Sequence, residues 1–167
     1  AATSSAFTVS PGAATKLAVT VQPSAVAASA AISPAVQVVV QDAAGNTVSS
    51  TASITLTITS GTGTSGAVLG GTVTQAAVAG VATFANLTVD KVGTGYTLAA
   101  TAPSVTSATS MVFAVTPGAA NRLAFTMQPS AVVAGAAIAP AVKVTVQDAR
   151  GNTVTGSTAS ITLAITS

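Results

Sequence analysis

A long internal repetition constrains this chain more than any other feature of its sequence. The phrase VQDAAGNTV at residues 40–48 returns as VQDARGNTV at residues 146–154, an offset of 106 positions. The register extends to both sides of the phrase in these matched pairs: Pro11 and Pro117, Gln22 and Gln128, Pro34 and Pro140, and, after a one-residue insertion, Ile54 and Ile161. Such self-similarity indicates successive copies of one structural unit.

The register divides the chain into three parts. Residues 1–10, with Phe7 and Val9, match the end of the following unit and are predicted to be the last strand of a preceding unit. Residues 11–116 form one complete unit, and residues 117–167 form the N-terminal half of the next. We therefore expect a segment of a tandem array.

Aliphatic residues alternate with small or polar ones inside each unit. The alternating sets are Leu17, Val19 and Val21, then Val36, Val38 and Val40, then Ile54, Leu56 and Ile58. A period of two is typical of half-buried strands, and the abundant Thr and Val favour extended backbone. A repeat of about 100 residues is too long for helical solenoids but suits an immunoglobulin-like sandwich of two sheets.

Glycine and serine clusters separate the predicted strands, because these residues favour turns. Seven strands are expected in the complete unit, at Thr15–Gln22, Ala35–Gln41, Thr51–Thr59, Ala67–Ala77, Val81–Val89, Tyr96–Thr101 and Ser107–Val115. Two more are expected in the partial units, at Ala2–Val9 and Ile161–Thr166. The predicted fold is all-β, a two-sheet sandwich repeated in tandem.

The repeated phrase is predicted to be a corner between two strands. Asp42 can accept hydrogen bonds from backbone N–H groups shortly after it, and Gly45 can adopt a positive φ. Asp148 and Gly151 have the same places in the second copy. We expect these four residues to shape the backbone.

Calcium binding at the corner is an alternative. Calcium takes roughly six to eight oxygen ligands, usually with several carboxylates. The candidate ligands are Asp42 with Asn46, and Asp148 with Asn152. One carboxylate per corner falls short of such a shell, so no cofactor is expected.

The scarcity of ionisable residues excludes several function classes. The chain has no His, no Cys and three acidic residues, whereas acid–base and nucleophilic catalysis need a base or paired carboxylates. Its five Lys and Arg are scattered singly, which does not fit nucleic-acid binding. The most hydrophobic window, residues 131–142, is shorter than the ~20 residues of a membrane helix and contains Pro140. Residues 1–10 lack the pattern of a signal peptide. We expect no enzyme, no nucleic-acid partner and no membrane insertion.

The motifs in combination resemble a known family. VQDAAGNTV, then ASITLTI, GVATFANLTV and GTGYTLAAT, resemble the bacterial Ig-like modules that occur in tandem in invasin- and intimin-type surface proteins. The resemblance implies that Tyr96, after VGTG, is a tyrosine-corner residue whose hydroxyl bonds to nearby backbone. The chain departs from many relatives at Thr47 and Thr153, where they have proline. The resemblance implies a spacer module and carries over no receptor-binding site.

Two functions are expected from these features. The first is a non-catalytic structural module of a bacterial cell-surface or extracellular protein, a stiff rod of neighbouring repeats that self-associates with identical chains into a filament or sheath. Scarce edge charges favour that association. The alternative is an adhesin-type module that binds glycan or host protein through loops at the sandwich end. The aromatic residues mostly fall at predicted core positions, which disfavours this alternative.

Overall fold

The computed structural model describes residues 1–165, and all regular structure in this range is β-strand. The strands are β1 (Lys16–Val21), β2 (Val26–Ala27), β3 (Val36–Gln41), β4 (Ser53–Ile58), β5 (Leu69–Gly70), β6 (Thr74–Ala76), β7 (Val81–Phe84), β8 (Thr88–Val89), β9 (Gly93–Tyr96), β10 (Leu98–Thr101), β11 (Ala108–Thr109), β12 (Phe113–Thr116), β13 (Arg122–Met127) and β14 (Lys143–Gln147). Within residues 1–165, no helix has the length and apolarity to cross a membrane.

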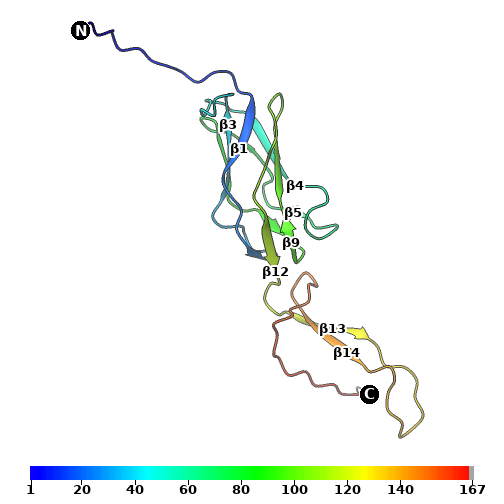
Figure 1. Cartoon of the computed structure of the whole chain (residues 1–167). Coiled ribbons are helices and arrows are strands. Elements are labelled where there is room, and N and C mark those ends of the chain that lie inside the picture. The colour runs from blue at the N-terminus through cyan, green and yellow to red at the C-terminus, as the bar shows by residue number, and fades with distance from the viewer. Residues whose placement is uncertain (166–167) are drawn as a thin grey trace.

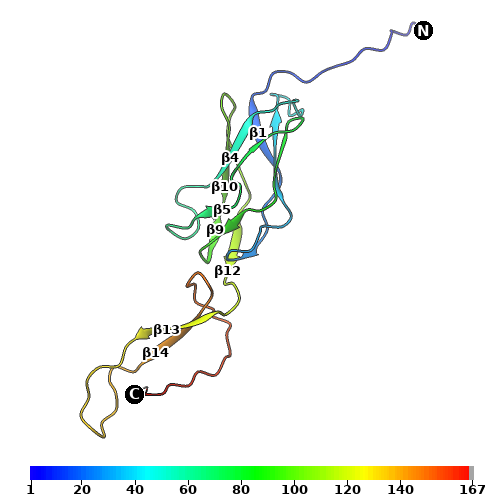
Figure 2. The same ribbon diagram turned by 180° about the vertical axis from the view of Figure 1, so that it is seen from behind.

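Residues 11–116, here called the first unit, contain β1 to β12 in several sheets (Figure 1). One sheet has the order β1-β3-β7, and a second has the order β11-β10-β4-β6. A third joins β2, β12 and β9, and β5 pairs with β8. Figure 2 shows these strands from behind, running along the long axis of the unit. The arrangement is consistent with a β-sandwich.

The core of the first unit lies between these sheets. Leu17 from β1, Val38 from β3 and Leu56 from β4 are 5%, 0% and 1% exposed and belong to one apolar cluster. Fully burying one such side chain stabilises a fold by about 1.5–3 kcal/mol. The alternation in the sequence therefore identifies the inward faces of these strands correctly.

Three of the aromatic side chains also lie in this core. Phe84, Tyr96 and Phe113 are buried, and the rings of Tyr96 and Phe113 lie 5.7 Å apart between centroids. Phe7 and Phe125 are exposed. They lie in segments 1–10 and 117–165, where fewer strands surround them.

Several predicted strands are wrong in their bounds because the chain changes sheets within them. The predicted strand Tyr96–Thr101 is two strands, since β9 pairs with β12 whereas β10 pairs with β4. The predicted strand Ser107–Val115 also divides, since β11 pairs with β10 and β12 with β2 and β9. Val81–Val89 divides in the same way between β7 and β8.

The predicted strand Ala67–Ala77 is interrupted for a different reason. Gly71 has a φ of +90°, which extended L-residues rarely adopt, and a Cβ at this position would overlap the carbonyl of Asn86. The chain therefore forms β5 and β6 on either side of this glycine. Strand β2 was not predicted, and it contributes only two residues to a parallel pairing with β12.

Residues 117–165, here called the second unit, repeat the antiparallel β1–β3 pair of the first unit. Arg122 pairs with Gln147 just as Lys16 pairs with Gln41, and both registers shift at the same place, between Phe125 and Met127 in β13. In Figure 1 this pair lies beyond the β12 end of the first unit, at the far side from the N-terminus.

The strands predicted at the two ends of the chain do not form in the described residues. Residues 161–165 have no strand, and Thr166 lies outside the described residues. In the first unit, the matching β4 is held between β10 and β6, and no described strand of the second unit takes either place. Residues 1–10 are extended but unpaired, so their assignment to a preceding unit stays a prediction.

Candidate functional site

The corner after β3 is organised around the Asp42 carboxylate. Its Oδ1 accepts from the Asn46 backbone N–H at 2.8 Å, and its Oδ2 accepts from Gly12 N at 2.9 Å and Asn46 Nδ2 at 3.0 Å. Gly45 has a φ of +92° and donates its N–H to the Asp42 carbonyl at 3.1 Å. The phrase folds as a turn because one carboxylate satisfies several N–H groups and glycine accepts the left-handed conformation.

The corner after β14 has the same construction. Asp148 Oδ1 accepts from Asn152 N at 2.9 Å, and Oδ2 accepts from Gly118 N at 3.0 Å and Asn152 Nδ2 at 2.8 Å. Gly151 has a φ of +87°. Asp148 also receives the backbone N–H of Arg150 at 2.9 Å. The two copies of the phrase thus have the same local structure.

These hydrogen bonds favour the ionised form of both carboxyls. The Asn46 side chain and the Gly12 N–H lower the pKa of Asp42 from 3.8 to about 2. Burial of Asp148 opposes ionisation, but hydrogen bonds from the Asn152 side chain and the Gly118 N–H outweigh it, so its pKa is also lowered. Both corners therefore hold a carboxylate at neutral pH.

The groups that surround the two carboxylates do not fit a calcium ion. Both oxygens of Asp42 and of Asp148 face N–H groups, whereas calcium requires an oxygen shell. Within residues 1–165, no three His, Cys, Asp or Glu side chains gather at one place. The Asp side chains hold the backbone of each corner together.

Asn152 also joins the second unit to the first. Its Nδ2 donates to the Asp90 carbonyl at 2.9 Å, and its Oδ1 accepts from Val92 N at 3.2 Å. Since Nδ2 also donates to Asp148 Oδ2, both hydrogens of the amide are engaged. The corner of one unit thereby binds the turn between β8 and β9 of the other.

Further contacts hold the segment between the units. The Thr116 carbonyl accepts from Ala28 N at 2.8 Å, and the Asn121 N–H donates to the Gln147 carbonyl at 2.8 Å. Between them, Gly118 is bonded to Asp148, and a Cβ on Gly118 would approach the Ala28 carbonyl to 3.3 Å. The connecting segment 117–121 is thus bonded to the second unit, and it follows directly on β12, which is bonded within the first.

Arg150 adds a contact that has no counterpart in the first phrase. Its Nε donates to Ser29 Oγ at 2.9 Å, across the junction. The matched residue is Ala44, which has no donor in its side chain. A hollow of about 390 Å³ lies beside this contact, between residues 28–29 and 148–150.

The turn that receives Asn152 is fixed from inside the first unit. The hydroxyl of Tyr96 donates to the Lys91 carbonyl at 2.8 Å, and the Tyr96 ring is fully buried. Asp90 Oδ1 accepts from Val68 N at 2.7 Å, and Lys91 Nζ donates to the Ser65 carbonyl at 3.1 Å. Residues 90–92 therefore present a fixed carbonyl and N–H to the second unit.

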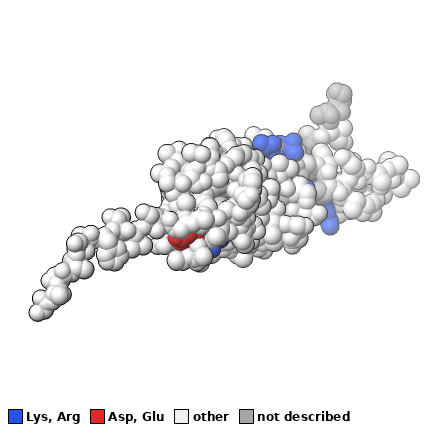
Figure 3. All heavy atoms as spheres, turned by 90° about the horizontal axis from the view of Figure 1, so that it is seen from above, with Lys and Arg blue, Asp and Glu red and all other residues white. Residues whose placement is uncertain are grey.

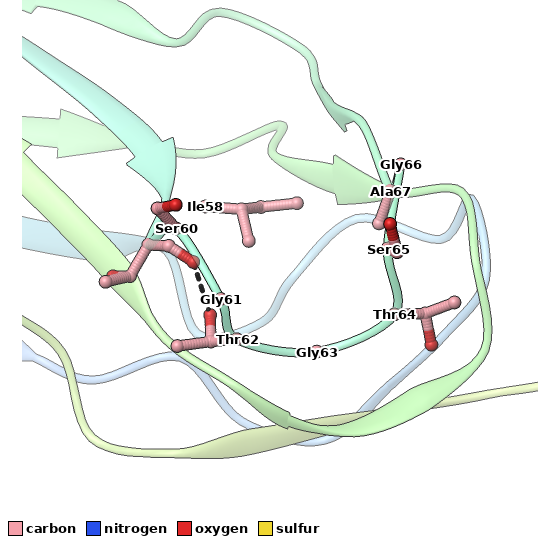
Figure 4. A pocket seen from close by; sticks show the side chains of 10 residues that line it. Ile58, Ser60, Gly61, Thr62, Gly63, Thr64, Ser65, Gly66 and Ala67 are labelled. Atoms are coloured by element: carbon pink, nitrogen blue, oxygen red, sulfur yellow. Dashed lines mark hydrogen bonds between the residues drawn. The ribbon is translucent and has the colours of Figure 1, made fainter.

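The loop of residues 59–67 lies over Tyr96 and encloses a hollow of about 350 Å³ (Figure 4). Thr62 Oγ1 donates to the Thr59 carbonyl at 2.8 Å. A Cβ on Gly63 would overlap the Tyr96 ring, so only glycine fits at this position. The hollow is lined by hydroxyl groups and glycine backbone, and none of its lining residues has a titratable side chain.

Charged side chains are sparse on the face shown in Figure 3, where they form small separate groups on an otherwise uncharged surface. Apart from the Arg150 guanidinium, the side-chain contacts between the units are made by amide, hydroxyl and backbone groups.

The sequence predicts structural roles for Asp42, Gly45, Asp148, Gly151 and Tyr96, and the structure places each of them in a turn or at its support. The inter-unit roles of Asn152, Arg150 and Ser29 were not predicted. The sequence gives a signal for Arg150, which stands where the first phrase has Ala44. No protein-family model matches the chain, and no curated protein sequence matches it.

Proposed function

We propose that this chain is a non-catalytic structural part of a long repetitive bacterial surface or extracellular protein, in which Ig-like units stack end to end as a stiff rod. The observation that carries the proposal is the Asn152 side chain, which bonds to Asp90 and Val92 of the adjoining unit while remaining bonded to its own corner. Such bonds act as a brace, since bending at the junction would break them.

The connecting segment supports the same function. Interfaces between domains normally allow relative motion unless they are extensive or well bonded. Here residues 117–121 follow directly on β12 and are bonded to Asp148 and Gln147 of the second unit, and the Arg150 contact with Ser29 adds a point of attachment besides Asn152. Contacts at separate points resist rotation about any single bond.

Small-angle X-ray scattering of the chain in solution tests the rod. A stiff junction predicts a scattering profile that one elongated conformation fits, and Asn152→Ala should shift the profile towards a mixture of bent conformations. Asn46→Ala is the matched control, because Asn46 makes the same corner bonds without the inter-unit ones. A mixture of conformations already present in the unmodified chain would contradict the proposal.

Self-association of identical chains is the second part of this function. Met111 and Val112, just before β12, are 69% and 67% exposed, and the chain has only five Lys and Arg and three acidic residues. Exposed apolar residues beside uncharged strand edges favour contact between chains. Sedimentation velocity over a range of concentrations tests this part, and a monomer at every concentration would contradict it.

A further inference from the structure

The corner at Asp42 to Asn46 has the structure of a docking site whose partner is not among the described residues. Asn46 makes the same bonds inside its corner as Asn152 does, within 0.2 Å of the same lengths. However, Asn46 is exposed whereas Asn152 is half-buried. Within residues 1–165, the Asn46 Oδ1 accepts no hydrogen bond, whereas the Asn152 Oδ1 accepts from Val92.

The occupied corner identifies what the free corner would bind. Asn152 takes a backbone carbonyl and a backbone N–H, both from the turn between β8 and β9. Because both groups belong to the main chain, the site depends on the shape of that turn more than on its side chains. Any unit that repeats this turn, with a tyrosine to hold it, offers the same pair of groups.

Residues 1–10 indicate where such a unit lies. Phe7 and Val9 are 83% and 82% exposed, but their matches Phe113 and Val115 are buried in β12 at 5% and 2%. The segment that follows, SPGAA at residues 10–14, matches TPGAA at 116–120 in the occupied junction. The sequence of residues 1–14 thus matches the last strand and the connecting segment of a unit.

We propose that the Asp42–Asn46 corner binds the β8–β9 turn of a unit of the same kind that precedes it in the same polypeptide, with Asn46 in the role of Asn152. The inference rests on the proposed stacking function and extends it to a second junction. The two junctions should also differ in the number of contacts that hold them. Ala44 cannot reach a serine as Arg150 reaches Ser29, so this junction has one contact fewer.

An extended chain tests the proposal directly. Residues 1–116 are joined to residues 11–167, so that Thr116 precedes Pro11 as it naturally precedes Pro117, and residues 11–167 stand after one added unit. Segmental ¹⁵N labelling of one copy at a time allows NMR to measure hydrogen exchange of the Val92 amide in each copy separately, and the first-copy amide reports on the added junction. In the extended chain this amide is expected to be protected.

Substitutions in the two copies separate docking from folding. Asn46→Ala in the second copy should speed exchange at the first-copy Val92 by about tenfold, because one hydrogen bond is lost. Asn46→Ala in the first copy is the matched control and should leave that amide unchanged. Ala44→Arg in the second copy should slow the exchange, since it restores the serine contact.

The outcomes distinguish the two proposals. An unprotected first-copy Val92, alongside a second-copy Val92 that remains protected by Asn152, would overturn the Asn46 assignment and leave the rod intact. Loss of protection at both junctions would overturn the proposed stacking as well. Equal effects of Asn46→Ala in either copy would show a folding defect and also contradict the docking role.

Discussion

The Tyr96 hydroxyl donates a hydrogen bond of 2.8 Å to the Lys91 carbonyl, and Lys91 lies between the two residues that bind Asn152. A buried core residue thus fixes the surface turn to which the next unit attaches. This arrangement couples the folding of one unit to the geometry of the junction.

Removal of that hydroxyl should weaken the first unit and its junction together. Tyr96→Phe keeps the ring against Phe113 but leaves the Lys91 carbonyl without its donor. We expect a loss of about 1 kcal/mol in the free energy of unfolding, measured by urea titration. Exchange of the Val92 amide should also speed up. An unchanged unfolding free energy would contradict the role given to this hydroxyl.

Removal of the Asn152 side chain should loosen the junction without unfolding either corner backbone. Asn152→Ala deletes the bonds to Asp90 and Val92, and exchange at the Val92 amide should rise by about tenfold. Asn46→Ala deletes the matching side-chain bond within its own corner but none between units, so it should leave exchange at Val92 unchanged. Similar exchange rates in the two variants would refute the bridging role.

Gly63 should not tolerate a side chain. Its φ of +65° and the Tyr96 ring both oppose a Cβ, so Gly63→Ala should cost about 2–4 kcal/mol in unfolding free energy. Gly61→Ala is the matched control, because Gly61 has a φ of +76° with nothing within 4 Å of the added atom. It should cost about 1 kcal/mol, from the backbone conformation alone. Equal losses in urea titrations would mean that the ring contact is unimportant.

Acid should destabilise the chain through its corners. The folded-state pKa of Asp42 is about 2, below its ordinary 3.8, so its stabilising effect is complete above pH 3.8 and is lost as the pH falls towards 2. Asp148 acts in the same direction. The urea midpoint should fall across this range, and the double variant Asp42→Asn with Asp148→Asn should show a smaller fall. A midpoint as pH-dependent in the double variant as in the parent would contradict this account.

The sequence predicts the core faces and the corners well, because both follow from local rules. Strict alternation places Leu17, Val38 and Leu56 inside, and Asp42 with Gly45 determines a turn through bonds to neighbouring residues. These features need no knowledge of which strands meet in space.

The sequence does not predict where the chain changes sheets. A continuous β pattern runs through Thr97, yet β9 and β10 on either side of it pair with strands of different sheets. The inter-unit bonds of Asn152 were hidden for the same reason, since they reach residues about sixty positions away in the sequence. Both depend on tertiary neighbours that local propensity does not encode.

The distance between the units tests the central account most directly. The chain has no cysteine, so spin labels can be attached at Thr20→Cys and Thr126→Cys, matched exposed positions on β1 and β13. Pulsed electron spin resonance then measures the distribution of distances across the junction. The account predicts one narrow distribution that broadens with Asn152→Ala and is unaffected by Asn46→Ala. A broad distribution in the parent chain, unchanged by Asn152→Ala, would contradict it.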